Sequence, residues 1–294
     1  MASASGLGPE GPVFESQYPD IRTETESSAS VLFYIPWPDS LYRISVMRTG
    51  IKNKNVYLQT YETTIMLKIK NFYFNDLHEC CSVAWDETGE CVIIDPGFYT
   101  DTERDQLSGF IKDKGLKPVK ILLTHAHFDH VFGLKECAQM YGIPVYMDPA
   151  DKETLHSADW YCRNFGFRTP PTDVETEDIH DGDKVKFGKT EFEVLSTPGH
   201  TPGGVCYLDR TDKVLFSGDT LFAGSIGRTD HPQGDYDRLM EGIFGKLVPL
   251  DGDITVIPGH GPHTTITDER TKNPFLQPFN LPYEDDGDTG EDKE

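Results

Sequence analysis

Residues 120–130 read KILLTHAHFDH, and this stretch decides how the rest of the chain is interpreted. Its apolar run predicts a short buried strand over Val119–Thr124. The polar side chains that follow at once are His125, His127, Asp129 and His130. A strand holds rigidly whatever stands at its end, so the pattern predicts a fixed cluster of imidazole and carboxylate groups.

Three further predicted strands end in a residue of the same type. They contain FEVLST, KVLFSG and ITVI, and the residues that follow them are His200, Asp219 and His260. Because strand ends that share one sheet edge lie close together, we expect these side chains to join the cluster. Glycines stand at 199, 218 and 259, where we expect them to let the backbone turn sharply into the site.

Five histidines and two aspartates make up this set. Imidazole nitrogen and carboxylate oxygen suit Zn²⁺ and similar divalent ions. The set is larger than one ion needs and suffices for two ions bridged by a carboxylate and a hydroxide. We therefore predict two divalent metal ions, zinc first with iron or manganese as alternatives, whose bridging hydroxide attacks an acyl carbon.

The remaining pattern alternates short apolar strands with amphipathic helices. Strands are predicted at 66–74, 91–95, 119–124, 145–147, 185–187, 190–197, 204–209, 213–219 and 254–257. Helices are predicted at 101–114, 131–141, 152–164 and 235–247. Helices alternate with strands in both halves, which indicates an α/β or α+β fold with a covered sheet.

The composition limits the partners. The 294 residues carry 27 Lys and Arg against 49 Asp and Glu, a formal net charge of −22. Nucleic acids and anionic membranes both attract basic surfaces, so neither partner is expected. No apolar run approaches the roughly 20 residues that span a bilayer, and no signal peptide is evident. We expect a cytoplasmic protein whose six cysteines, which show no CxxC spacing, are reduced and buried.

Three segments differ in composition. Residues 1–65 begin with a run rich in Ser, Gly, Pro and Glu, so we predict a poorly ordered N-terminal extension with strand fragments at most. Residues 66–283 hold nearly all of the periodic pattern and are predicted to form the catalytic domain. Residues 284–294 hold seven acids and one Lys, and are predicted to be an acidic disordered tail.

Four motifs between residues 66 and 280 resemble, in order, those of the metallo-β-lactamase superfamily. They read His125-Ala-His127-Phe-Asp129-His130, Thr197-Pro-Gly-His200, Ser217-Gly-Asp219-Thr220 and Pro258-Gly-His260-Gly261. The resemblance implies a four-layer αββα sandwich with the metals at one sheet edge. It also implies a first metal on His125, His127 and His200. The residues it assigns to the second metal are Asp129, His130 and His260, with Asp219 bridging the two.

Within the superfamily the chain is most similar to glyoxalase II-type thioester hydrolases (hydroxyacylglutathione hydrolases). The stretches that carry this likeness are DTLF at 219–222, GSIGRTD at 224–230, GPHTT at 261–265 and NPF at 273–275. Only 34 residues follow His260, which resembles the branch with a short C-terminal region. The resemblance implies hydrolysis of a small-molecule thioester like S-D-lactoylglutathione, with Asp129 as the catalytic residue that orients the hydroxide.

Other functions stay open at this point. A persulfide dioxygenase on the same fold shares the HxHxDH and Gly-Arg-Thr-Asp stretches, and the resemblance would place its single Fe(II) on His125, His200 and Asp219. A non-catalytic metal-binding protein is the third hypothesis, which the complete set of seven ligand-type residues disfavours. β-Lactam hydrolysis is also disfavoured, because many superfamily members share the metal cage. The acyl group, the thiol and the oligomeric state are left open.

Residues close to the motifs carry further predictions. Asp95, at the end of CVIID, resembles a position that orients a ligand histidine by a hydrogen bond. Arg228 is expected either to support the metal loop or a substrate carboxylate, or to form a surface ion pair. His231 and His263 are expected either to contact the ligand residues or to be ordinary loop histidines. The aromatic residues expected to line the pocket or to pack as core or lid are Trp160, Tyr161, Phe165 and Phe167.

Overall fold

The computed structural model describes residues 30–36, 42–52, 55–62 and 67–277. The chain divides into two units, and the smaller contains a sheet in the order β1-β2-β3. Its strands are β1 (Ser30–Pro36), β2 (Tyr42–Lys52) and β3 (Asn55–Glu62). This sheet falls inside the segment 1–65, whose boundary and poor order stay predictions. The acidic tail expected at 284–294 lies outside the described residues.

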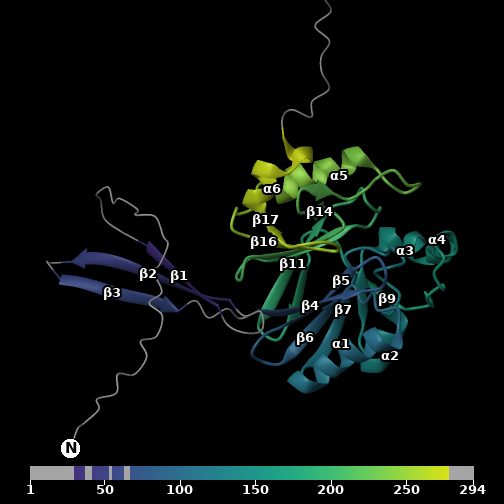
Figure 1. Cartoon of the computed structure of the whole chain (residues 1–294), viewed down its shortest axis with the longest axis horizontal. Coiled ribbons are helices and arrows are strands. Elements are labelled where there is room, and N and C mark those ends of the chain that lie inside the picture. The colour runs from purple at the N-terminus through teal and green to yellow at the C-terminus, as the bar shows by residue number, and fades with distance from the viewer. Residues whose placement is uncertain (1–29, 37–41, 53–54, 63–66, 278–294) are drawn as a thin grey trace, which may run out of the picture. The chain divides into compact units, whose positions relative to one another are not determined.

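The larger unit begins with a sheet of six strands in the order β4-β5-β6-β7-β8-β9. Its strands are β4 (Lys68–Phe74), β5 (Glu79–Trp85), β6 (Glu90–Ile94), β7 (Lys117–Leu122), β8 (Val145–Met147) and β9 (Thr176–Asp178). Two helices, α1 (Asp101–Lys114) and α2 (Leu134–Tyr141), cover its outer face (Figure 1). A capping box between Thr100 and Glu103 begins α1, and a left-handed Gly115 ends it.

A second sheet runs in the order β10-β11-β12-β13-β16-β17. Its strands are β10 (Lys184–Phe187), β11 (Thr190–Ser196), β12 (Val205–Asp209), β13 (Val214–Gly218), β16 (Thr255–Pro258) and β17 (Thr264–Thr265). Its outer face carries α5 (Tyr236–Gly242), a π-helical turn (Ile243–Leu247) and α6 (Ile266–Lys272). A short hairpin of β14 (Leu221–Phe222) and β15 (Ser225–Ile226) follows β13.

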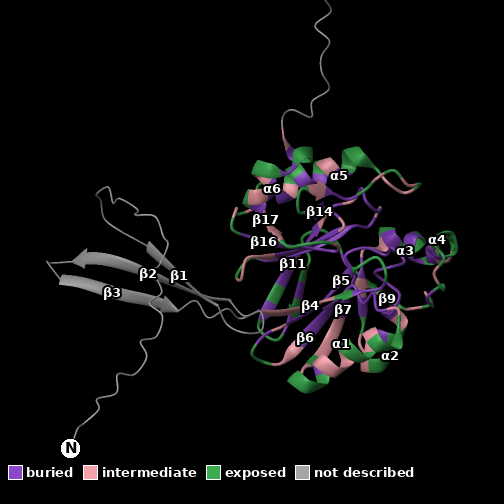
Figure 2. Ribbon diagram, viewed as in Figure 1, coloured by how far each residue is buried: buried purple, intermediate pink, exposed green. Residues whose placement is uncertain are grey.

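The described residues form four buried apolar clusters, of which three separate four layers and the fourth, which includes Phe128 and Phe132, packs against α4 (Ala158–Phe165). One cluster, which includes Leu122 and Phe192, lies between the two sheets. A second, which includes Leu107, lies under α1 and α2, and a third, which includes Leu239, lies under α5 and α6. Figure 2 shows buried residues along the strands and exposed ones on the outer faces of the helices. Each buried side chain of this size contributes roughly 1.5–3 kcal/mol. The predicted αββα sandwich is confirmed.

Two hydrogen bonds join the sheets at the edge where β7 ends. Val205 N donates to Thr124 O at 2.8 Å, and the hydroxyl of the buried Tyr207 donates to Leu123 O at 2.7 Å. Both acceptors immediately precede His125. The turn that carries the HAHFDH motif is therefore held to the opposite sheet by its own backbone.

Several observed elements differ from the predicted ones, and the short strands β9, β14, β15 and β17 were not predicted. The strand β5 was missed, because six of its seven residues are buried and show no alternation. The helix expected at 131–141 begins only at Leu134, since the preceding residues continue the turn. The helix expected at 152–164 is divided at Ser157 into α3 (Lys152–His156) and α4 (Ala158–Phe165). The short helix α6 was not predicted.

Within the described ranges, the structure holds no helix that combines the length and the apolarity needed to cross a bilayer. All six cysteines are buried and unbridged in the structure, as their spacing predicts.

Candidate metal centre

The seven predicted ligand residues converge at one edge of the sandwich. Four of them, His125, His127, Asp129 and His130, lie in the turn that follows β7. The other three follow β11, β13 and β16, and are His200, Asp219 and His260. All seven are buried or partly buried. The convergence expected from the strand ends is therefore observed.

A first group of donor atoms comes from His125, His127 and His200. One nitrogen from each of these residues lies within 4.8 Å of the others. His127 Nδ1 and His200 Nε2 are 2.9 Å apart. His125 Nε2 is buried and has no hydrogen-bond partner in the described part of the chain. Three converging imidazole nitrogens are a set of ligands that Zn²⁺ commonly takes.

A second group comes from Asp129, His130 and His260, whose donor atoms also lie within 4.8 Å of one another. His130 Nε2 and His260 Nε2 are 3.3 Å apart. Asp129 Oδ2 lies 3.2 Å from His260 Nε2. This group mixes nitrogen and oxygen, which suits zinc, iron or manganese.

Asp219 lies between the two groups. Its Oδ2 is 3.4 Å from His200 Nε2 in the first group and 3.6 Å from His260 Nε2 in the second, while its Oδ1 is 3.6 Å from His130 Nε2. Oδ1 is buried without a hydrogen-bond partner among the described residues. A buried carboxylate oxygen is costly unless something positive neutralises it. The donor set therefore fits metal ions, with one carboxylate facing both groups.

Burial and neighbouring charge set the protonation of these residues. Burial lowers the pKa of His125 and His127 far below the usual histidine range, and neighbouring imidazoles lower it further. Burial also opposes the charged form of His130, but Asp129 and Asp219 outweigh it and raise the pKa to about 9. His125 and His127 are therefore neutral imidazoles, the form that binds a metal.

Asp95 makes the hydrogen bond that the sequence predicts. Its Oδ2 lies 3.0 Å from His130 Nδ1, and the carboxylate also accepts from Thr124 N at 2.7 Å and from Thr124 Oγ1 at 2.5 Å. Asp95 adopts a left-handed backbone with φ of 49°, which is uncommon for a residue other than glycine. Such strain persists where surrounding contacts over-determine it, as these three hydrogen bonds do.

The structure distinguishes between the alternative roles that the sequence left open for Arg228 and His263. The Arg228 side chain forms an ion pair with Asp230 at 2.8 Å, while its carbonyl oxygen accepts from His200 Nδ1 at 2.8 Å. Arg228 therefore supports a predicted ligand through its backbone and pairs at the surface through its side chain. His263 is exposed and contacts Asn71 at 2.6 Å.

Two of the glycines act for different reasons. Gly218 has a left-handed φ of 48°, as the predicted sharp turn requires. Gly259 has no such angle, and a Cβ there would collide with Asp219 Oδ1 and the ring of His130. Its role is to let the backbone approach the centre closely, which the sequence does not distinguish from a turn.

Two acidic residues near the centre were not identified from the sequence. Glu79 is fully buried with both carboxylate oxygens unpartnered within the described ranges, and its Oε1 lies 4.0 Å from His130 Nδ1. Burial and then the charge of Asp95 raise its pKa well above the usual range. Asp151 is also fully buried. Neither residue stands in a motif, so no local signal could have found them.

Aromatic residues from α4 border the first group. The Tyr161 ring lies 5.8 Å from the ring of His127, and Phe165 stacks on Phe128 at 5.5 Å. Trp160 and Phe165 are more than half exposed, at 57% and 56%. Tyr161 therefore reaches the centre, while Trp160 offers an apolar surface beside it.

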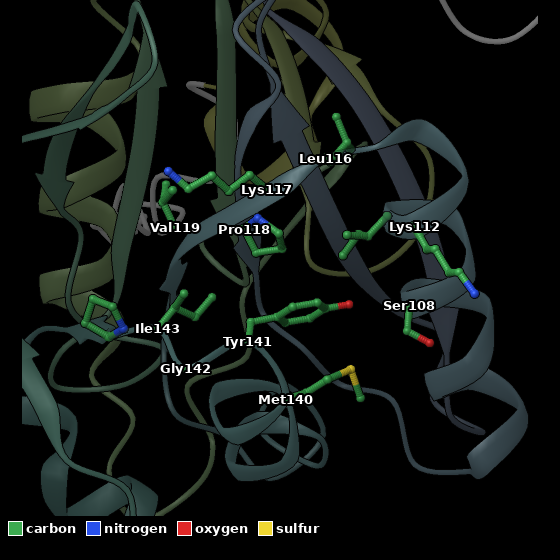
Figure 3. Close-up of a pocket in the computed structure, with 12 residues that line it drawn as sticks. Ser108, Lys112, Leu116, Lys117, Pro118, Val119, Met140, Tyr141, Gly142 and Ile143 are labelled. Carbon is green, nitrogen blue, oxygen red and sulfur yellow. The ribbon is translucent and has the colours of Figure 1, made fainter.

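A surface hollow of about 690 Å³ lies elsewhere, between α1, α2 and the start of β7. Figure 3 shows Tyr141, Met140 and Leu116 around it. None of its described lining residues belongs to the metal-ligand set.

Comparison with known proteins gives three close similarities and one family. The model of the metallo-beta-lactamase superfamily matches residues 79–260. Hydroxyacylglutathione hydrolase GloC of Haemophilus influenzae is 40% identical over 200 residues, 67% of this chain and 92% of that protein. A crystal structure of TTHA1623 in a di-iron-bound form is 37% identical, with a TM-score of 0.64, over 70% of this chain and 100% of that one. The BLEG-1 B3 metallo-beta-lactamase is 36% identical, with a TM-score of 0.66, over 71% and 100%.

Proposed function

The chain belongs to the metallo-beta-lactamase superfamily and is a metal-dependent hydrolase of that family, and we propose that it uses two metal ions to cleave a small-molecule thioester. The observation that carries the proposal is the position of Asp219, whose two oxygens face both groups of donors. A single ion in the first group would leave Asp219 Oδ1, which faces His130 and is buried without a partner among the described residues, without a cation.

The proposed ligands divide as the two groups do. His125, His127 and His200 would hold one ion, the second group would hold the other, and Asp219 would contact both. Divalent ions at such a site supply a water-derived nucleophile at neutral pH and polarise an acyl oxygen. Zinc is proposed first, while the similarity to a di-iron-bound protein supports iron as the alternative.

Asp129 is the proposed catalytic residue. Burial opposes ionisation of its carboxyl, but His130 and His260 outweigh it and hold the pKa well below the usual range. An ionised carboxylate can accept a hydrogen bond from the attacking water and so orient it toward the acyl carbon. A thiolate leaves without protonation, so the reaction requires no general acid from the chain.

The preference for a thioester rests on a set of loops that support His200. Asn273 Nδ2 donates to Ser225 O at 2.9 Å, which joins the NPF stretch to the GSIGRTD stretch. The same loop supplies the Arg228 carbonyl that accepts from His200 Nδ1. These are the stretches that resemble glyoxalase II-type hydrolases, and the 40% identity to GloC supports the same substrate class. Location in the cytoplasm, where glutathione thioesters occur, is part of the proposal.

The test is metal quantification of the purified full chain together with hydrolysis assays. We expect two ions per chain and release of thiol from S-D-lactoylglutathione. Turnover of another thioester alone would remove glutathione from the proposal and keep the reaction class. Hydrolysis of a chromogenic β-lactam without any thioesterase activity would overturn the thioester. One iron per chain with oxygen uptake on a persulfide would establish the dioxygenase instead.

A further inference from the structure

In each of the five histidines of the centre, the ring nitrogen that does not face a metal needs a hydrogen-bond partner. A metal-ligating imidazole almost always uses its other nitrogen to donate to a carboxylate, a carbonyl or water, which fixes the tautomer and the ring orientation. In four of the five this partner is present. The pairs are His125 with Thr124 Oγ1 at 3.1 Å, His130 with Asp95 at 3.0 Å, His200 with Arg228 O at 2.8 Å and His260 with Leu77 O at 3.0 Å.

His127 is the exception. Its Nδ1 faces His200 Nε2 inside the first group at 2.9 Å, which leaves Nε2 as the outward nitrogen. That nitrogen is buried and has no partner among the residues that the structure describes. A buried and unpaired polar atom costs about 1–3 kcal/mol, so this position requires an explanation.

His231 is the polar neighbour of His127. Both of its ring nitrogens are buried and unpartnered within the described part of the chain. Its ring centroid lies 5.2 Å from that of His127, with an interplanar angle of 78°. No direct hydrogen bond joins the two rings, and His231 lies about as close to the ring of His200, with centroids at 5.4 Å. The His127–His231 pair therefore stands at a separation that one water can bridge.

From this geometry we propose that His231 is a positioning residue for His127. It accepts a hydrogen bond from His127 Nε2–H through one bridging water, and so fixes the tautomer in which Nδ1 is free to bind a cation. The inference rests on the proposed metal centre and adds a residue to its support.

The backbone of the loop around His231 is held by contacts that do not involve the imidazole. The His231 carbonyl accepts from Gly234 N at 2.8 Å, and a Cβ on Gly234 would collide with the backbone of Thr229. A change of the His231 side chain alone leaves both features intact. An aromatic ring without nitrogens at this position should therefore preserve the loop and remove only the hydrogen bond.

The test compares His231→Phe, His231→Gln and the wild-type full chain, with His156→Phe as a control at an exposed histidine at the end of α3. Binding of Zn²⁺ is measured by competition with a chromophoric chelator, and the absorption spectrum of the Co²⁺-loaded protein reports the ligand geometry. We expect His231→Phe to bind one of two ions about 10–100-fold more weakly with an altered Co²⁺ spectrum. Gln carries a carbonyl oxygen that can accept the same hydrogen bond, so it should recover part of both. The control should match the wild type.

Two other outcomes overturn the inference. His231→Phe with wild-type affinity and spectrum shows that His127 is oriented without it. A rise in KM for the thioester with unchanged metal binding assigns His231 to the substrate instead. If His231→Phe does not fold, judged by circular dichroism of the metal-free protein, His231→Met takes its place in the comparison with Gln. A wild-type chain that binds no metal removes the proposed function itself, which this experiment reports separately.

Discussion

Asp151 offers the sharpest test of how the centre is held together. It is fully buried, and its carboxylate accepts from Ala126 N at 2.8 Å, Thr201 Oγ1 at 2.9 Å and Gly203 N at 2.6 Å. Ala126 lies between two predicted ligands, and the other two donors follow His200. One carboxylate therefore joins the two loops that supply the first group of histidines.

Asp151→Asn isolates this function with little change of shape. An amide offers one oxygen where the carboxylate has two. With that oxygen toward Ala126 and Thr201, the NH₂ group faces Gly203 N–H, which loses its acceptor. An unpaired buried donor costs about 1–3 kcal/mol, and loss of charge weakens the remaining bonds by about 1 kcal/mol more. We expect the free energy of unfolding to fall by about 2–4 kcal/mol, or the Tm by about 4–16 °C.

The assay is urea and thermal unfolding of the metal-free proteins, with Asp148→Asn as the matched control. Asp148 caps the same turn through Ala150 N, and Asn caps as well as Asp, so the control should change stability by less than about 0.5 kcal/mol. An equally small change in Asp151→Asn would refute the reasoning.

The deficit of Asp151→Asn should also depend on pH. Burial raises the pKa of Asp151, against the hydrogen bonds from Gly203 and Ala126 that lower it. A folded-state pKa above the unfolded value means that the native state holds the proton more tightly. Stability of the wild type is then lost as the pH rises from the unfolded pKa near 3.9 through the folded one. Asn does not titrate, so the deficit should shrink between pH 4 and 7, and a deficit that grows would contradict the assignment.

Three further substitutions test the centre. Asp129→Ala should lower thioester turnover by about 10²–10⁴-fold in a chain that still folds, and unchanged turnover would favour a non-catalytic function. Asp95→Asn should weaken one metal ion by about 10–100-fold in chelator competition, because a carboxylate that orients a histidine is lost; equal affinity would limit Asp95 to a structural role. Gly227→Ala should cost about 1–3 kcal/mol in urea unfolding, since its Cβ would collide with the Asp219 carbonyl, whereas Gly245→Ala has open space around it.

The sequence identifies the residues of the candidate site more completely than the buried residues that hold them in place. The reason is physical. A residue of metal-ligand type at the end of an apolar strand, such as His125 or Asp219, is visible locally because the strand is periodic and the residue type is rare. Asp95 was found the same way, as the last residue of CVIID. Asp151 and Glu79 have no such signal, since their importance depends on which buried groups the folded chain brings to them.

The fold was also predictable where the sequence carries a local signal and not where it lacks one. The helix at 101–114 was correct at both ends, because a capping box and a left-handed glycine mark them in the sequence. β5 was missed because a strand buried on both faces loses the alternation that identifies strands. The HAHFDH turn delays the start of α2 to Leu134, because the residues 131–133 continue that turn instead of starting the helix.

The unpartnered polar atoms show that the centre is the part of the fold adapted to binding. In the described part of the chain, the buried side-chain nitrogens and oxygens without a partner belong to Glu79, His125, His127, Tyr141, Asp219 and His231. All except Tyr141 lie at the metal centre or against one of its ligands. The other buried side-chain nitrogens and oxygens of the described residues have hydrogen-bond partners. Poor packing therefore does not explain why the unpartnered atoms gather at the centre. Two of them, His125 Nε2 and Asp219 Oδ1, are proposed metal-binding atoms. At about 1–3 kcal/mol each, these two atoms make the metal-free fold less stable than its core would allow, and cations that pair with them return that free energy as binding. Metal affinity and stability of this chain are therefore one coupled quantity.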